Sequence, residues 1–410
     1  AGAWCGQNKY LSAIKNAFQN FMPLTIAGAI GVLWCNVLVN DQTGLGLFFK
    51  PIMALDFLNP AFQAVNFCTI SCITVGITLG IAQEIGVWNM GAERAGYIPG
   101  LVGLAAWLSV TNTSHMVEGA KEAFTGIAGN ELGATGLFTG MIIGVLSVEL
   151  FCFFEKQDAL KIKMPEQVPP GVARAFEVLV PATITLIITA CIGSACYNLT
   201  GLYLNDVIKN GIQGPLGAVG ATIPGVMIIY LVIMLFWLVG IHGNNMLSAV
   251  KEALFTPLAL ENVEKFNKGE KPTNIINMYF LQMCGEFGGS GVTIGLVIAI
   301  MIFGKREDNK AIATLSLVPG LFNINETVTF GVPMVLNPIL GIPFVVAPLI
   351  TIIIGYVLTV IGFCPVACLT VPWTTPPIVF GFLACGANVM GAVTQAILIV
   401  VSTVIYVPFL

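Results

Sequence analysis

The sequence predicts an all-α polytopic membrane protein with about ten transmembrane helices and re-entrant hairpins in its C-terminal half. Hydrophobic residues make up 56% of the 410 positions and charged residues only 9%, whereas soluble domains carry about 25% charged residues. The apolar residues also gather in runs close to the ~20 residues that an α-helix needs to cross a bilayer. These runs are too long for the alternating strands of about ten residues that build a membrane β-barrel.

The apolar runs give the expected positions of the spans. Each is rich in Leu, Ile, Val and Phe, and each is flanked by polar or glycine-containing segments. The clearest runs are Phe21 to Asn40, Phe62 to Ala82, Gly136 to Phe154, Phe176 to Cys196, Ile223 to Ile241, Gly291 to Phe303 and Val346 to Phe363.

Charge and cysteine content exclude several function classes. The net charge is −4, and no Lys/Arg cluster is dense enough to follow a phosphate backbone, so a nucleic-acid partner is not expected. Eleven cysteines are present, but no Cys-x-x-Cys pair indicates a zinc site or a redox pair. The sequence therefore predicts no metal and no cofactor.

Basic residues predict the orientation in the membrane. Lys9 and Lys15 precede the first run, and Lys156, Lys161, Lys163 and Arg174 follow the run that ends at Phe154, which places the N-terminus and the 155–175 loop in the cytoplasm. An even number of spans would return the C-terminus to the same side. The segments 251–271 and 305–310 are both basic, yet a single clear apolar run separates them. A re-entrant hairpin resolves this conflict, because it enters the membrane and returns to the same face.

Gly and Pro interrupt the second half of the chain far more often than the first. Breaks occur at 240–243, 285–291, 319–320, 331–333 and 372–377, beyond the Pro-rich loop at 165–171. Transporters use such broken helices to expose polar groups to a solute near mid-membrane. We therefore divide the chain into a scaffold, residues 1–195, and a transport domain, residues 196–410. Gly289 and Ser290, in the glycine-rich break, are predicted to contact the substrate.

Glu326 is the first candidate for chemistry. It directly precedes an apolar stretch. Placing an ionised carboxylate at membrane depth costs about 2.5–3.5 kcal/mol, so a carboxylate in that position indicates polar partners or a function. Asn323 and Asn325 could share its burial and contact the substrate. The alternative is a loop carboxylate that caps the next helix.

His242 and Trp373 are two further candidates. His242 closes an apolar run between Gly240 and Gly243 and is followed by Asn244, and the glycines allow the backbone to approach a ligand closely. Gly243 and Asn244 are predicted to contact the substrate. A helix cap is the ordinary alternative for this histidine. Trp373 lies between prolines and offers a flat face on which a sugar ring could stack, although membrane-interface anchoring is an equally ordinary role.

Four stretches of the sequence carry a more specific signal when they are taken together. They are Met164–Ala173 with Phe176 and Pro181, Phe236–Gly243, Asn323–Glu326 followed by Phe330–Pro333 and Asn337-Pro338, and Val371–Pro377. In order and spacing they resemble the enzyme IIC subunits of the sugar phosphotransferase system, in the group that handles lactose, cellobiose and diacetylchitobiose. One departure is visible, because the family usually has Asn-Glu-Pro where this chain has Asn325-Glu326-Thr327.

The resemblance implies group translocation of a disaccharide in a bacterial cell membrane. The sugar would enter from outside and receive a phosphoryl group from a phosphocysteine on a separate enzyme IIB subunit. Glu326 would contact the reacting hydroxyl and His242 would assist. The family is homodimeric through its N-terminal half, which implies that role for residues 1–195.

Two other classes remain open from the residues alone. An ion-coupled secondary transporter would move its solute unmodified and use Glu326 as a proton or cation site. A channel or a purely structural membrane protein fits less well, because repeated helix breaks around an acidic and an imidazole side chain indicate an occluding site.

Overall fold

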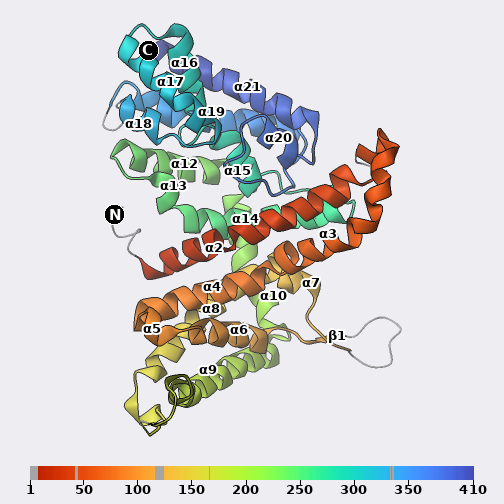
Figure 1. Cartoon of the computed structure of the whole chain (residues 1–410), viewed down its shortest axis with the longest axis vertical. Helices are drawn as coiled ribbons and strands as arrows, with labels where there is room; N and C mark the ends of the chain where they lie inside the picture. The colour runs from red at the N-terminus through yellow and green to blue at the C-terminus, as the bar shows by residue number, and fades with distance from the viewer. Residues whose placement is uncertain (1–7, 42–44, 116–123, 166, 333, 335–336) are drawn as a thin grey trace. The chain divides into compact units, whose positions relative to one another are not determined.

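The computed structural model describes residues 8–41, 45–115, 124–165, 167–332, 334 and 337–410, and nearly all its regular elements are helices (Figure 1). Glu166 and Pro333, which belong to the family-like stretches, lie outside these residues. The chain forms two compact units. One contains residues 8–24 and 68–216, and the other contains residues 25–67 and 217–410. The predicted division into 1–195 and 196–410 stays a prediction; in the structure residues 25–67 join the C-terminal part.

The unit containing residues 68–216 is built around three helices, α4, α6 and α8, which pack on one another, with α9 against α6 and α8. Two strands of two residues each pair antiparallel in this unit, with Ser114 opposite Thr125. Its elements are the start of α2 (Lys9–Leu33), α4 (Ile73–Met90), α5 (Ala92–Ala95), α6 (Ile98–Val110), β1 (Ser114–His115), β2 (Phe124–Thr125), α7 (Gly129–Leu132), α8 (Ala134–Glu155), η5 (Asp158–Leu160), α9 (Pro170–Thr200), α10 (Leu204–Ile208), η6 (Lys209–Gln213) and the start of α11 (Gly214–Gly220).

Small residues let these central helices approach closely. A Cβ on Gly103 of α6 would lie 2.3 Å from the Cβ of Ala82 on α4. A Cβ on Gly140 of α8 would lie 2.2 Å from the hydroxyl oxygen of Thr78 on α4. Membrane helices associate through such contacts because lipid supplies no hydrophobic drive between them.

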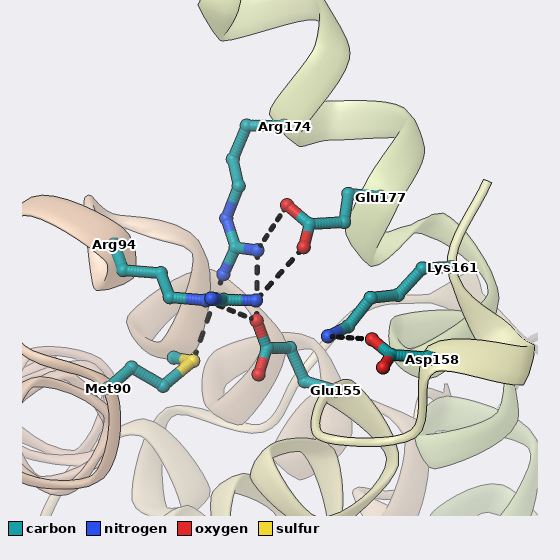
Figure 2. Close-up of polar contacts among 7 residues, drawn as sticks. All are labelled: Met90, Arg94, Glu155, Asp158, Lys161, Arg174 and Glu177. Carbon is teal, nitrogen blue, oxygen red and sulfur yellow. Dashed lines mark hydrogen bonds and ion pairs between the residues drawn. The ribbon is translucent and has the colours of Figure 1, made fainter. Parts of the chain in front are cut away.

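Ion pairs join α5, α8 and α9 at one end of this unit (Figure 2). The Glu155 carboxylate, only 3% exposed, accepts hydrogen bonds from Arg94 Nε at 2.8 Å and from Arg174 Nη1 at 2.9 Å. Both arginines also reach Glu177. The hydrogen bond to Glu155 raises the pKa of the Arg94 guanidinium, and Lys161 lowers the pKa of the exposed Asp158 carboxyl through its hydrogen bond.

We expect Glu155→Gln to lower the stability of this unit by about 1.5–3 kcal/mol, because the buried acceptor of two charged hydrogen bonds loses its charge. Thermal unfolding of the purified protein in detergent measures the change. Glu177→Gln is the matched control: it touches the same arginines but is more exposed, so its effect should stay below about 1 kcal/mol. Equal effects of the two substitutions would contradict this account.

The unit containing residues 217–410 places α21 against α16, α19 and α20, with α12 and α15 against α19 (Figure 1). Its elements are the end of α2, η1 (Trp34–Leu38), η2 (Leu45–Leu47), η3 (Lys50–Leu58), α3 (Asn59–Asn66), the start of η4 (Phe67–Ser71), the end of α11, α12 (Ile223–Leu238), α13 (Gly243–Met246), α14 (Ser248–Asn267), α15 (Met278–Gly285), α16 (Ile294–Phe303), α17 (Glu307–Leu321), α18 (Glu326–Gly331), α19 (Gly341–Val360), α20 (Val379–Ala384), α21 (Val389–Tyr406) and η7 (Val407–Phe409).

Five described helices are long and apolar enough to cross a membrane, or six if a pair bent by 42° counts as one span. Four of them cover predicted runs, in α2 with η1, α8, α9 and α19, and the fifth is α21 with η7. Other predicted runs form shorter pieces: α12 has 16 residues and α16 has 10. The bent pair, Lys50–Ser71 and Ile73–Met90, covers the run at Phe62 to Ala82. Ten spans are thus not confirmed, because the apolar stretches are interrupted, and the re-entrant hairpins stay a prediction.

Candidate functional site

The two predicted catalytic side chains, His242 and Glu326, lie next to each other. His242 Nε2 is 3.8 Å from Glu326 Oε1. His242 precedes α13, where its Nδ1 accepts a hydrogen bond from the backbone N–H of Asn245 at 3.2 Å. A neutral ring that accepts at Nδ1 carries its proton on Nε2. The imidazole therefore directs a donor toward the carboxylate.

Glu326 is the first residue of the short helix α18. The sequence led us to expect a buried carboxylate, but the side chain is 48% exposed, and that of His242 is 38% exposed. The reason is that α18 begins at Glu326, so its side chain projects from the end of the helix rather than from its packed face. A solute hydroxyl can therefore reach both groups.

Asn325 and Asn244, both predicted to contact the substrate, converge on Ser290. Asn325 is 4% exposed and donates from Nδ2 to the Ser290 carbonyl at 2.8 Å. Asn244 donates from Nδ2 to the Ser290 hydroxyl oxygen at 2.9 Å. Its Oδ1 is buried and has no hydrogen-bond partner among the described residues. This oxygen is available to accept a hydrogen bond from a ligand hydroxyl.

Asn323 braces three segments of the site. Its Oδ1 accepts a hydrogen bond from the backbone N–H of Gly288 at 2.6 Å. Its Nδ2 donates to the carbonyls of Trp373 and Thr375. Its backbone is left-handed, with φ 63°, a conformation that Asn tolerates better than most residues. These bonds favour a positioning role, because both donors of the amide are already used.

The glycine-rich turn between α15 and α16 requires its glycines. Gly289 has φ 90°, and a Cβ on it would lie 2.6 Å from Cγ of Asn325. Gly291 has φ 78°, and a Cβ there would lie 2.4 Å from the Phe344 ring. The turn therefore holds Ser290 between two residues that have no side chain.

We expect Gly289→Ala to weaken sugar binding about tenfold or more, because left-handed strain of about 1–3 kcal/mol adds to the displacement of Asn325. Binding to the purified protein, measured by calorimetry, checks this. Gly320→Ala is the matched control, since a Cβ there would make only an ordinary contact, 3.4 Å from Ile294. Unchanged affinity in Gly289→Ala would mean that the turn does not shape the site.

Trp373 and Gly243 occupy different positions relative to this cluster. The Trp373 side chain is 44% exposed, and its backbone carbonyl is tied to Asn323. Gly243 is buried against α12, where a Cβ would lie 2.0 Å from the Ile233 carbonyl oxygen. Gly243 therefore has a packing reason to be glycine, in addition to its predicted contact with substrate.

A second set of residues, which was not predicted from the sequence, packs around the predicted site residues. Trp237 is 2% exposed, and its ring lies 4.4 Å from the His242 ring, centroid to centroid. Behind the glycine-rich turn, Lys251 forms an ion pair with Glu286, which also accepts a hydrogen bond from the Tyr230 hydroxyl at 2.8 Å. Opposite charges in otherwise apolar stretches were the signal that could have revealed this pair.

Lys251 does not lie in a cytoplasmic loop, as the predicted membrane orientation assumed. We counted it among the basic residues of a cytoplasmic segment, 251–271. In the structure this segment begins within α14, and the Lys251 side chain is only 7% exposed, because it is paired with Glu286. Lys251 therefore cannot count as a loop charge.

Comparison with known proteins places this geometry. Residues 15–348 match the family described as "Phosphotransferase system, EIIC". The chain belongs to the EIIC family. It is 33% identical over 408 residues to the oligo-beta-mannoside-specific EIIC component of Bacillus subtilis, covering 98% of this chain and 89% of that protein. It is 30% identical to the cellobiose-specific EIIC component of Lactococcus lactis, covering 98% and 94%.

A solved EIIC structure has the same fold. ChbC, the IIC component of the N,N'-diacetylchitobiose-specific phosphotransferase system, matches with a TM-score of 0.90 and 29% identity, covering 99% of this chain and 94% of ChbC. This EIIC protein thus belongs to the lactose, cellobiose and chitobiose group, as its sequence motifs predicted. It is a multi-pass membrane component of a sugar phosphotransferase system, a role that implies a sugar substrate and an enzyme IIB partner.

Proposed function

We propose that this EIIC protein binds a β-linked disaccharide beside His242 and Glu326, moves it inward and presents one hydroxyl to a phosphocysteine of a separate enzyme IIB. The observation that carries the proposal is the 3.8 Å approach of imidazole and carboxylate, next to buried amides that can bind hydroxyls. The named relatives, which are specific for oligo-beta-mannoside, cellobiose and diacetylchitobiose, support the substrate class.

In the proposed step, the sugar hydroxyl oxygen attacks the phosphorus of the phosphocysteine. The O–P bond forms as the S–P bond breaks, the cysteine leaves as a thiolate, and the hydroxyl proton passes to the Glu326 carboxylate. His242 donates from Nε2 and holds the carboxylate or the sugar oxygen in position. Phosphoryl transfer relies mostly on such alignment and charge stabilisation. The product carries a phosphate dianion and is repelled by the carboxylate, which makes transport one-directional.

The proposal also covers the residues that contact the sugar, the oligomeric state and the orientation in the membrane. Asn244, Asn325, Ser290 and Trp373 bind the sugar, while Asn323, Gly243 and Gly289 set its surroundings. The protein acts as a homodimer through its N-terminal part, with both termini in the cytoplasm. Exposed apolar side chains along α9, including Leu179, Ile187 and Leu199, provide a surface for lipid or for a second copy.

Proteoliposomes test the proposal against an ion-coupled transporter. With phosphorylated enzyme IIB on the cytoplasmic side, labelled cellobiose should accumulate as sugar phosphate, and omission of enzyme IIB should stop accumulation. Chromatography of the vesicle contents distinguishes the free from the phosphorylated sugar. Accumulation of free sugar driven by a proton or sodium gradient alone would overturn the phosphotransferase mechanism in favour of the ion-coupled one.

A further inference from the structure

A polar cavity of about 460 Å³ lies in the same compact unit as His242, but its walls come from other elements. They are the end of α2, η1, η3, α3 and Asn267 at the end of α14. None of the residues of the proposed sugar site lines it. Amide and carboxylate side chains dominate the described lining, including Asn36, Asn40, Asp56, Asn59, Gln63 and Asn66.

Polar residues from two segments of the chain, 36–41 and α3, line this cavity. Asn59, Gln63 and Asn66 follow the i, i+4, i+7 spacing that places side chains on one face of α3. Asn36 belongs to η1, a π-helical turn, a feature frequent at functional sites, and Asn40 follows shortly after the end of this turn. Both η1 and α3 belong to stretches that are candidates for crossing the membrane. Polar stripes persist at such depth where they line an aqueous path or bind a solute.

Contacts within the protein hold these walls in place. Asn36 donates from Nδ2 to the Val32 carbonyl at 3.0 Å and to Oδ1 of Asn267 at 3.1 Å. Behind the lining, the rings of Trp34 and Phe62 stack with their centroids 4.3 Å apart. Asn59 donates from Nδ2 to the Val39 carbonyl at 3.5 Å, whereas its Oδ1 is buried without a hydrogen-bond partner among the described residues. An acceptor in that position gains from a hydroxyl donor on a ligand.

Charge and chemistry select the class of ligand. The described lining carries two carboxylates, Asp41 and Asp56, and no Lys, Arg or His, so it repels a phosphorylated sugar. No group of three His, Cys, Asp or Glu side chains suited to a metal occurs in the described part of the chain. Amides both donate and accept hydrogen bonds, which suits a neutral ligand covered with hydroxyls. The volume lies within the range of about 300–1,000 Å³ typical of small-molecule sites.

We propose that this cavity is a second binding site, which holds the neutral disaccharide and rejects its phosphorylated product. It is separate from the His242 and Glu326 site, and it rests on the proposed function only for the choice of sugar. Such a site would concentrate free sugar on the protein without competition from the product.

Photolabelling locates this site on the full-length protein in nanodiscs. A cellobiose carrying a diazirine should label peptides within 31–66 as well as peptides near the glycine-rich turn and α18. Excess cellobiose should compete for both labels, whereas phosphorylated cellobiose should leave the 31–66 label in place. The double variant Asn40→Leu/Gln63→Leu should reduce the 31–66 label at least fivefold and keep the other. Gln63→Asn, which retains the amide, is the matched control and should keep most of the label.

The contrary results distinguish failure of the second site from failure of the proposed function. Absence of a 31–66 label while α18 is labelled would remove the second site and leave the proposed function standing. Loss of the α18 label, while the 31–66 label persists and is competed by cellobiose, would contradict the proposed function and leave the second site standing. A 31–66 label that the double variant does not reduce would show that the polar lining does not bind the sugar. A label displaced by millimolar calcium, and abolished by Asp56→Asn, would show a cation site instead.

Discussion

Glu326→Gln should lower the rate of phosphoryl transfer to the sugar by about 10²–10⁴-fold, because the amide cannot take the hydroxyl proton during transfer. Sugar binding should fall much less, since glutamine has the same shape and still accepts a hydrogen bond from the hydroxyl. The measurement pairs initial rates of sugar phosphate formation in proteoliposomes with binding to the purified variant.

The control for this prediction is Glu264→Gln. Glu264 is an exposed carboxylate of the same compact unit and forms a surface ion pair with Lys268. Its replacement should leave both rate and affinity close to those of the unmodified protein. Normal turnover in Glu326→Gln would exclude Glu326 as the base, and equal losses of rate and affinity would make it only a binding residue.

Lys251→Met should have the second large effect. It leaves the Glu286 carboxylate, only 17% exposed, without its cation, and breaking a buried pair from one side costs about 3–5 kcal/mol. The glycine-rich turn begins directly after Glu286, so sugar binding should weaken together with stability. Thermal unfolding in detergent and sugar affinity of the same preparation measure the two effects.

A double substitution separates charge from packing. Lys251→Met/Glu286→Gln removes both charges, and the amide oxygen introduced by the second change can still accept a hydrogen bond from the Tyr230 hydroxyl. The double variant should therefore recover much of the stability that Lys251→Met loses. A double variant as unstable as the single one would show that the Lys251 stem, rather than its charge, supports the turn.

Sequence reasoning located the helices well where apolar runs were long. The runs at 136–154 and 176–196 fall within α8 and α9, because about twenty mostly apolar residues leave a bilayer-spanning helix as the main solution. It was weaker where Gly and Pro divide the runs, since composition shows that a helix breaks but not which way the chain turns afterwards. The ten expected spans are therefore not confirmed: the described residues contain five or six helices of spanning length and several short ones.

The sequence singled out His242 and Glu326 by their polar, glycine-broken setting, the family resemblance supplied their expected roles, and the structure brings the two side chains together. What sequence could not supply was the supporting layer. Lys251 and Glu286 are 35 residues apart, and although each is a charge in an apolar stretch, their pairing is seen only in the fold. The membership of residues 25–67 in the C-terminal unit was equally hidden, because it depends on tertiary contacts such as that between Asn36 and Asn267.

The brace formed by Asn323 links chemistry to specificity. One amide fixes the approach to Glu326, the turn that carries Ser290 and the stretch that carries Trp373. A substitution that turns the Trp373 indole toward a different sugar would also displace the Glu326 carboxylate, which we propose as the base. A change of sugar preference should therefore arise through residues that touch the sugar without touching Asn323. Swapping the 371–377 stretch alone between relatives should slow turnover before it broadens the range of sugars accepted.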